Sequence, residues 1–304
     1  MSNNKKTKVF VTGGTGFVGK YVIEELLKNG FKLKCLVRLG SEKKLSKYKN
    51  IEITKGDITD YESLLNGMEE CSAVINLVGI IREYKKKGIT FEKLHFQATK
   101  NCVDAAKELK IQRFIQMSAL GTRENAVAEY HKTKFKAEEY VKKSGLTYTI
   151  FRPSIIFGKE DKSINLFADI IKKFGFFIVF GDGKYKLQPV SVKNIAQGFA
   201  KTINNEKTYN KIFEICGPKS INFKELLDII GNAVNKKVFK LHLPLFLAKP
   251  TIRLFGRFDF SPITYEQLIM LLEDNICDEK DFFNTFKIKP ISLEQEIKNY
   301  LPAL

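Results

Sequence analysis

The stretch that decides the fold is Lys8-Val-Phe-Val-Thr12, which runs directly into Gly13-Gly14-Thr15-Gly16-Phe17-Val18-Gly19. The first five residues are mostly β-branched or aromatic, which is typical of a buried parallel strand. The glycines then predict a tight turn, and residues 20–27 have the apolar spacing of a helix. Strand, glycine loop and helix in this order bind a dinucleotide pyrophosphate at the helix N-terminus. We therefore predict that Thr12 to Gly19 form a dinucleotide-binding loop, with a simple glycine turn as the alternative.

Three of these glycines have expected roles. Gly13 makes a turn that a Cβ atom would obstruct, and Gly16 lets the backbone approach a pyrophosphate. Gly19 lets the helix pack against its strand. The helix N-terminus then offers N–H donors and a partial positive charge to the phosphates.

The first 151 residues alternate between predicted strands and predicted helices. Strands are predicted at 8–12, 31–37, 51–55, 73–77, 113–117 and 147–151, and helices at 91–109 and 130–143. A further helix is predicted to begin at a capping box, Thr59-Asp-Tyr-Glu62. Strands interleaved with helices predict an α/β fold with a Rossmann-type doubly wound parallel sheet. Its ligand is expected at the carboxyl ends of the strands.

The regularity loosens after Arg152-Pro153. Helices are predicted at 165–174 and after 194, strands at 176–180 and 211–216, and helix starts at the capping spacings of Asn222, Thr264 and Ser292. We predict a dinucleotide-binding core of residues 1–158, to which residues 186–216 return. Residues 159–185 and 217–304 are predicted to form a smaller, mostly helical C-terminal lobe for a substrate or partner.

The chain is strongly basic, with 51 Lys and Arg against 34 Asp and Glu and a net charge of +17. Lys supplies 44 of these 51 residues and is spread along the whole sequence. Because guanidinium is the preferred group for reading nucleic acid, the shortage of Arg argues against a nucleic-acid partner. We interpret the charge first as a solvated lysine surface, and second as attraction to an anionic lipid surface or an acidic partner.

The cysteines and histidines show no metal-ligand spacing. Cys35, Cys71, Cys102, Cys216 and Cys277 are dispersed, which predicts reduced thiols and no metal site. The sequence also lacks a G-x-S-x-G elbow, so metallohydrolase and serine hydrolase functions are disfavoured.

Neither a membrane span nor a signal peptide is predicted. No stretch is long and apolar enough to cross a membrane, and the N-terminal Met-Ser-Asn-Asn-Lys-Lys leads straight into the first strand. We therefore expect a cytoplasmic location, with peripheral attachment to the inner face of a membrane as an alternative.

Cofactor selectivity is expected at the end of the second strand. An NAD-selective site places Asp or Glu about 20 residues past the glycines, whereas this chain has Arg38, followed by Ser41, Lys43 and Lys44. A guanidinium cannot accept a hydrogen bond from a ribose hydroxyl, but it pairs with a 2′-phosphate. This favours NADP(H), with NAD(H) as the alternative; Arg38 would then be one more exposed base on a basic protein.

The ends of the next two strands complete the predicted cofactor site. Gly56-Asp57-Ile58 follows the third strand and offers a carboxylate to the adenine amino group. Asn76-Leu77-Val78-Gly79 follows the fourth strand and places amide and small residues where a ribose would pass.

Tyr130 and Lys134 lie four residues apart on a predicted helix and therefore share one face. In this geometry a lysine ammonium lowers a tyrosine pKa and binds nicotinamide ribose, while the phenol acts as general acid or base. The spacing alone carries little weight in a lysine-rich chain. Its position between the fifth and sixth strands makes both residues catalytic candidates.

Together these motifs resemble the extended or atypical branch of the short-chain dehydrogenase/reductase superfamily, which includes NAD-dependent epimerases and dehydratases. The resemblance is closest to the NAD(P)H-binding accessory subunit of respiratory complex I and its bacterial relatives, and it covers nearly the whole chain. The matching stretches are VFVTGGTGFVG, CLVR, KGDITD, AAKELKIQRFIQMSALG, YHKTKFKAEEYV, TIFRPSIIFGKED, LQPVSVKNIAQG and SPITYEQLIMLLEDN.

The resemblance implies a role for each matching residue. Pyrophosphate would be held by Thr12 to Gly19, the 2′-phosphate by Arg38 and the adenine by Asp57. Lys134 would hold the nicotinamide ribose, with Pro153 and Ser154 near the carboxamide. Ile58 and Ile156 are further predicted cofactor-binding residues. Asn76, Val78 and Gly79 would line the ribose, and Tyr130 would be the proton donor.

One segment departs from the family pattern. Active extended members place a serine cluster after the fifth strand, and its last member polarises the substrate oxygen. Here the run is Met117-Ser118-Ala119-Leu120, so Ala119 takes that position and Ser118, a further catalytic candidate, comes one residue early. Only ten residues separate Ala119 from Tyr130, so the loop that shapes a substrate site is short. The departure bears on catalysis and leaves cofactor binding intact.

Residues 239–258 interleave apolar residues with Lys240, Lys249, Arg253 and Arg257. This pattern at helical spacing predicts a membrane or partner surface or, as the more common case, a core-facing helix with a solvated side. Residues 172–180 similarly predict a core strand or, less favoured, a pocket wall.

Three functions are compatible with the sequence. The first is an NADP(H)-binding accessory or assembly factor of respiratory complex I or of quinone metabolism. The second is an active NADPH-dependent reductase, epimerase or dehydratase acting on a small apolar or lipid-derived carbonyl. The third is a regulator that senses NADP(H).

Overall fold

A computed structural model describes residues 7–256, 258 and 261–303. The described residues of 1–152, 195–213 and 281–288 form one compact unit, and those of 153–194, 214–280 and 289–304 form a second. Arg257 and the N-terminal Met-Ser-Asn-Asn-Lys-Lys, both considered above, lie outside the described residues.

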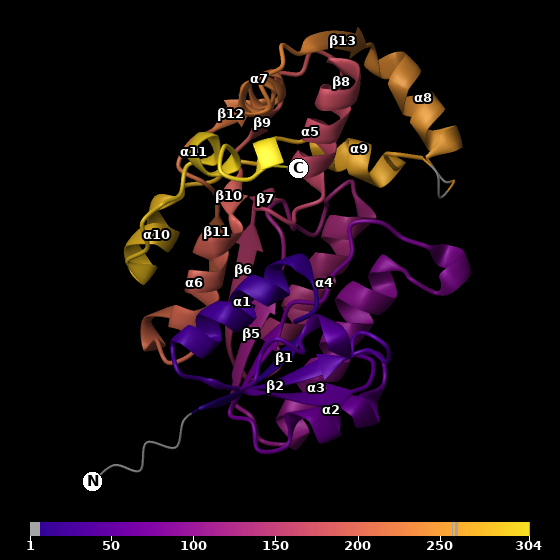
Figure 1. Cartoon of the computed structure of the whole chain (residues 1–304). Helices are drawn as coiled ribbons and strands as arrows, with labels where there is room; N and C mark the ends of the chain where they lie inside the picture. The colour runs from indigo at the N-terminus through magenta and orange to yellow at the C-terminus, as the bar shows by residue number, and fades with distance from the viewer. Residues whose placement is uncertain (1–6, 257, 259–260, 304) are drawn as a thin grey trace. The chain divides into compact units, whose positions relative to one another are not determined.

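A seven-stranded sheet of order β11-β6-β5-β4-β1-β2-β3 organises the first unit (Figure 1). Its strands are β1 (Lys8–Thr12), β2 (Lys32–Val37), β3 (Ile51–Lys55), β4 (Ala73–Asn76), β5 (Arg113–Met117), β6 (Thr147–Pro153) and β11 (Lys211–Ile215). Strands β1 to β6 pair in parallel. The strand order reverses at β1, which is the switch point where a doubly wound sheet binds its ligand. The predicted Rossmann-type α/β fold is confirmed.

Helices cover both faces of this sheet (Figure 1). On one face α2 (Tyr61–Met68), α3 (Ala98–Glu108) and α4 (Glu129–Lys142) pack side by side, and on the other lie α1 (Phe17–Lys28) and α6 (Val192–Thr202). The helix α10 (Lys280–Phe286) and the short turns η1 (Glu42–Lys44), η2 (Lys85–Lys87), η3 (Glu92–Gln97) and η4 (Glu206–Thr208) complete the unit. Phe10, Met68, Val74, Cys102 and Phe114 are fully buried beneath α2, α3 and α4.

Two local predictions are corrected by this unit. The helix expected at 91–109 is not uniform, because η3 is a π-helical turn that precedes α3. The capping box expected at Thr59 is wrong, since the N-cap of α2 is Asp60, which accepts a bond from the Ser63 N–H at 3.2 Å. Thr59 is engaged elsewhere: its N–H and hydroxyl donate to Asp57 Oδ1 at 2.9 and 2.7 Å.

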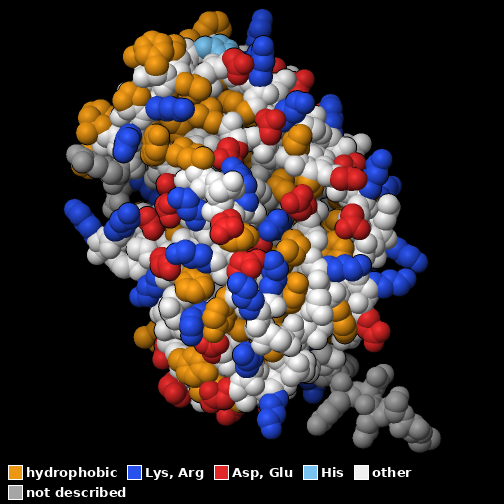
Figure 2. Space-filling model, turned by 180° about the vertical axis from the view of Figure 1, so that it is seen from behind, with side chains coloured by type: hydrophobic (Ala, Val, Ile, Leu, Met, Phe, Trp, Pro, Cys, Tyr) orange, Lys and Arg blue, Asp and Glu red, His pale blue; other side chains and the backbone are white. Residues whose placement is uncertain are grey.

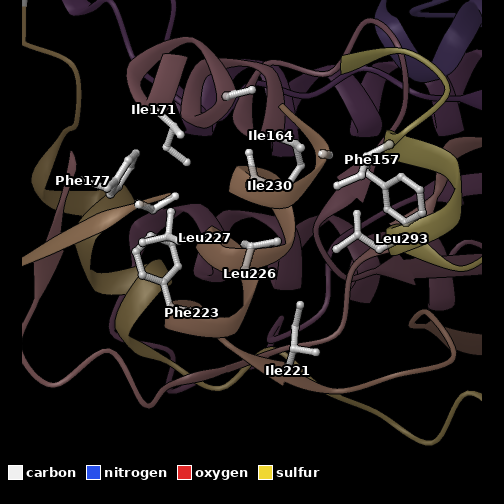
Figure 3. Packing of buried hydrophobic residues seen from close by; sticks show 14 of the residues in the cluster. Phe157, Ile164, Ile171, Phe177, Ile221, Phe223, Leu226, Leu227, Ile230 and Leu293 are labelled. Atoms are coloured by element: carbon white, nitrogen blue, oxygen red, sulfur yellow. The ribbon is translucent and has the colours of Figure 1, made fainter. Parts of the chain in front are cut away.

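The second unit packs short strands and helices around its own core. Its elements are β7 (Ile156–Phe157), α5 (Ser163–Phe174), β8 (Phe176–Phe180), β9 (Lys186–Leu187), β10 (Val190–Ser191), β12 (Ile221–Asn222), α7 (Phe223–Ala233), β13 (Phe239–Leu243), α8 (Leu245–Phe255), α9 (Tyr265–Leu272), α11 (Leu293–Ile297) and η5 (Leu301–Ala303). The core is formed mainly by α5 and α7, with side chains such as Ile171, Phe223 and Leu227 (Figure 3).

The capping predictions in this unit have mixed outcomes. The boxes at Asn222 and Thr264 are confirmed, each with both reciprocal hydrogen bonds. Ser292 is the N-cap of α11 but makes no side-chain capping bond. Residues 239–243, which were expected to continue a helical pattern, instead form β13 beside β8.

Two of the five cysteines form a disulfide. Cys216, just past β11, is bonded to Cys277, 61 residues later in the chain, whereas Cys35, Cys71 and Cys102 are buried free thiols. The prediction of reduced thiols is therefore wrong for this pair. Its partners are brought together by tertiary folding, which linear spacing does not reveal.

We expect denatured protein purified without reductant to take up three maleimide labels per chain, because only three thiols are free. The same protein should take up five labels after reduction. Intact-mass spectrometry counts the labels, and five labels without reductant would contradict the disulfide.

Candidate dinucleotide-binding site

The glycine loop is in close backbone contact with the neighbouring strand end. Gly13 adopts a φ of +74°, and a Cβ atom there would lie 3.0 Å from the backbone carbon of Leu77. A Cβ atom on Gly19 would lie 2.2 Å from the carbonyl oxygen of Gly13. Since neither position has room for a side chain, the first turn of α1 can sit directly on the loop.

The outer side of this loop is accessible and electropositive. Gly16 is exposed, and Thr15, Phe17 and Val18 are half-buried. Gly16 caps α1 without a side-chain hydrogen bond, and the first turn of α1 has no acidic residue. The first N–H groups of a helix have no intrahelical acceptor, so they can donate to an anion, aided by the helix dipole. Loop and helix together can therefore bind a pyrophosphate.

A buried polar network fixes the adjoining end of β4. The Thr12 hydroxyl donates to Asn76 Oδ1 at 2.7 Å, and Asn76 Nδ2 donates to Gln116 Oε1 at 3.0 Å and to Thr99 Oγ1 at 3.1 Å. The same Asn76 oxygen accepts the Val78 N–H at 3.2 Å. Both Thr12 and Asn76 are buried, so Asn76 acts on the segment through Val78 and not through an exposed amide.

Arg38 and Asp57 follow two neighbouring strands at the same edge of the sheet. Arg38 is exposed immediately after β2, and Asp57 is half-buried just beyond β3. The Gly56 N–H donates to the Val37 carbonyl at 3.1 Å, which keeps the two strand ends together. Ile58 is buried beside them. A cation at the end of β2 is the feature expected of a 2′-phosphate site.

Lys134 reaches from α4 to the ends of β4 and β5. Its ammonium donates to the Met117 carbonyl at 3.2 Å. A Cβ atom on Gly79 would lie 2.9 Å from the same nitrogen, so Gly79 leaves the space that Lys134 occupies. Burial lowers the pKa of Lys134 to about 8, and nearby Glu138 opposes this shift.

Tyr130 lies among aromatic rings on the same helix. Its ring meets the rings of Phe91, His95 and His131 edge-on, with centroids 5.7, 5.1 and 5.2 Å away. Burial raises the pKa of Tyr130 to about 12. This differs from the expectation that Lys134 lowers the tyrosine pKa, because desolvation of the phenolate dominates here.

His95 also belongs to this cluster, although no motif or spacing in the sequence marks it as a site residue. Its Nδ1 lies 3.0 Å from the Thr133 hydroxyl, which itself donates to the Glu129 carbonyl at 2.9 Å. Its Nε2 lies 3.1 Å from the Ile80 nitrogen and 3.0 Å from the Ile80 carbonyl oxygen, so the ring contacts the Ile80 backbone whichever of its two nitrogens carries the proton. Burial and the neighbouring Lys134 hold the pKa of His95 well below its usual range, so the ring is neutral.

The segment after β5 places its hydroxyl away from solvent. Ser118 is buried; its N–H donates to the Phe151 carbonyl at 2.7 Å, and its Oγ lies 3.4 Å from the Thr122 hydroxyl. Ala119, which aligns with the family serine, is also buried and carries no polar group.

The remaining predicted residues begin the second unit. Pro153 ends β6, and the Ser154 hydroxyl donates to Asn275 Oδ1 at 2.6 Å. Ile156 pairs with Val190 between β7 and β10. Their role in cofactor binding stays a prediction.

In the part of the chain that the structure describes, no group of three or more His, Cys, Asp or Glu residues is arranged to hold a metal ion. Among the same residues, no helix has the length and apolarity needed to cross a bilayer.

We expect dinucleotide affinity to weaken as pH rises through about 8, because Lys134 then loses the ammonium predicted to hold the ribose. The fall should approach about tenfold per pH unit above that value if only the charged form binds. Fluorescence titration with NADPH between about pH 6.5 and about pH 9.5 measures it. Lys134→Met should bind weakly with a flat pH profile. A flat profile in the unmodified protein would contradict this role.

Residues 13–205 match the family model described as NAD(P)H-binding. In sequence, the chain is 31% identical over 247 residues to "NADH dehydrogenase [ubiquinone] 1 alpha subcomplex subunit 9, mitochondrial" of Arabidopsis thaliana, covering 79% of this chain and 61% of that protein. It is 26% identical over 258 residues to the chloroplastic "Divinyl chlorophyllide a 8-vinyl-reductase" of the same plant, covering 79% and 61%. The chain thus spans less than two thirds of either relative.

Among solved structures, the chain is similar to the NADPH-dependent quinone oxidoreductase QOR2 of Escherichia coli complexed with NADPH. The TM-score is 0.79 at 17% identity, over 96% of this chain and 99% of the other. This likeness supports the fold alone. The sequence relatives confirm the resemblance to the complex I accessory subunit that the motifs indicated.

Proposed function

We infer from the membership of this chain in the NAD(P)H-binding family that it holds NADP(H) as a resident ligand. In this accessory role it neither oxidises nor reduces the bound nucleotide. The supporting relative is the Arabidopsis protein named as a subunit of NADH dehydrogenase [ubiquinone]. By that likeness, the partner of this chain would be a respiratory or other quinone-linked membrane complex.

One contrast within the site carries the proposal. The cofactor side has the glycine loop, the open N-terminus of α1 and Arg38, all at the carboxyl edge of the sheet. The chemical side has Ala119 where active relatives place a serine, and Ser118 is buried against Thr122. A phenol with a pKa of about 12 is also a poor proton donor near neutral pH. These features support binding and argue against turnover.

Each residue has a role in this proposal. The N–H groups of the loop and of the first turn of α1 bind the pyrophosphate, and Arg38 pairs with the 2′-phosphate. Asp57 accepts from the adenine amino group. Lys134 bonds the nicotinamide ribose, and neutral His95 keeps Ile80 and Thr133 in place beside it.

Arg38→Ala is expected to weaken NADP(H) binding about 10- to 100-fold, since a charge-assisted bond contributes about 1.5–3 kcal/mol. NAD(H) affinity should change by less than about threefold, because NAD(H) lacks the 2′-phosphate. Isothermal titration calorimetry with both dinucleotides gives the comparison. Lys28→Ala removes the same charge from the far end of α1 and should leave both affinities unchanged. Equal losses for both ligands would show that Arg38 does not read the phosphate.

Neither wild type nor Tyr130→Phe is expected to oxidise NADPH faster than protein-free buffer does when a short-chain ubiquinone analogue is supplied. The Phe variant should also keep its NADP(H) affinity within about twofold. Absorbance at the nicotinamide band follows the reaction.

The second candidate is an active NADPH-dependent reductase, which the presence of Tyr130 and Lys134 on one helix favours. Turnover in the wild type that Tyr130→Phe abolishes would establish this candidate and overturn the accessory role.

A further inference from the structure

We propose that the second unit carries a surface that docks onto an anionic lipid bilayer, formed by β8, β13 and α8. This surface, called the apolar face below, is defined by Phe174, Phe176, Ile178, Phe239, Leu241, Phe246, Leu247, Leu254, Phe255 and Phe258. All ten side chains are exposed. The inference goes beyond cofactor binding and does not depend on it.

The strand pair supplies one half of the apolar face. In the parallel pairing of β8 with β13, Phe176 lies beside Phe239, and Ile178 lies beside Leu241. Phe239 is 68% exposed, whereas Phe177 and Val179, which alternate with the outer residues of β8, are buried in the core. Strand residues alternate between faces. The outer face of this strand pair is therefore apolar on both strands and exposed, whereas the opposite face carries Phe177 and Val179 on β8 and Lys240 and His242 on β13.

Helix α8 supplies the other half. Its packed side is a narrow stripe of Ala248 and Ile252, one turn apart. At 100° per residue, Phe246, Leu247 and Leu254 fall within one sector on the opposite side. Phe246 is 75% exposed and Leu254 is 50% exposed. Because α8 exposes large apolar side chains on the side away from the core, we expect that side to contact another surface as well.

Helix and strand pair adjoin at their ends. A Cβ atom on Gly181, directly after β8, would lie 3.1 Å from Leu245 at the start of α8. The Gly181 N–H also donates to the Leu243 carbonyl at 2.8 Å. β8, β13 and α8 lie at the top and upper right of Figure 1. In Figure 2, which is turned by 180° about the vertical axis, hydrophobic side chains gather with lysine and arginine at the upper left.

The charged residues near the apolar face indicate which kind of partner binds it. The described residues of 170–181 and 236–258 contain seven Lys and Arg and no Asp or Glu, with Asp169 and Asp182 directly outside the first range. The whole chain, by comparison, has two acidic residues for every three basic ones. Some of these cations have protein partners, since Lys240 pairs with Asp228. On α8, Lys249 and Arg253 are exposed and border the Phe246–Leu254 sector. Exposed aromatic and leucine side chains bordered by cations are typical of a surface that binds an anionic bilayer. The apolar side chains insert below the headgroups, and the cations contact the anionic headgroups.

The length of α8 decides the mode of contact. Its 11 residues are too few to span a bilayer, for which about 20 are needed. The helix would therefore lie in the plane of the interface.

Vesicle flotation of the full chain tests the proposal. We expect binding at least tenfold stronger to vesicles of phosphatidylcholine with 30% phosphatidylglycerol than to phosphatidylcholine alone at low salt. Phe246→Gln with Leu254→Gln, and separately Lys249→Glu with Arg253→Glu, should each reduce the binding at least tenfold. Lys107→Glu with Lys110→Glu reverses the same charge on exposed residues of the first unit and should bind like the wild type.

Thermal melting and NADPH titration of every variant serve as controls. The melting temperature and the NADPH affinity should both equal those of the wild type, so that a loss of vesicle binding is not due to unfolding or to loss of the cofactor site. Three results would overturn the proposal: no preference for anionic vesicles, wild-type binding by both apolar-face variants, or an equal loss in the Lys107/Lys110 control. A fourth result would come from light scattering. If the wild type is a dimer and the variant with Phe246→Gln and Leu254→Gln is a monomer, a second copy of the chain covers the apolar face in place of a bilayer.

Discussion

The site depends on one backbone contact, the close approach of Gly19 to the Gly13 carbonyl beneath the first turn of α1. A Cβ atom at Gly19 would come within 2.2 Å of that oxygen, so no other residue lets the helix begin there. Gly13 in turn presses against Leu77, just past β4. The contact fixes the helix N-terminus at the point where the strand order reverses. The capacity of the loop and of α1 to bind a pyrophosphate follows from that position.

Around this contact, buried polar side chains hold the backbone in place through hydrogen bonds. Asn76 ties β1 to β4 and β5 through Thr12 and Gln116, and His95 ties the segment after β4 to α4 through Ile80 and Thr133. A buried hydrogen-bonded network of this kind makes a rigid wall. Rigidity suits a permanently bound ligand, as the proposed accessory role requires.

The sequence was most informative where local physics decides the outcome. Glycine spacing and apolar periodicity predicted the loop, the parallel sheet and its fold class, and Asn222 and Thr264 marked true helix starts. Tertiary packing decided the rest. The Cys216–Cys277 bond joins distant segments, and Asp57 draws Thr59 away from the cap of α2. The π turn η3 places His95 against Tyr130, which helical spacing alone does not predict. The raised pKa of Tyr130 likewise comes from desolvation of its side chain by tertiary packing, which includes the rings of Phe91 and His95.

Native mass spectrometry of the full chain, purified without added nucleotide, tests the central claim that this is a resident NADP(H) site without turnover. The account predicts one NADP(H) per chain, retained after incubation with a quinone acceptor and with its oxidation state unchanged. An empty chain that takes up NAD(H) and NADP(H) equally well, or a bound NADPH that is oxidised and released, would contradict it.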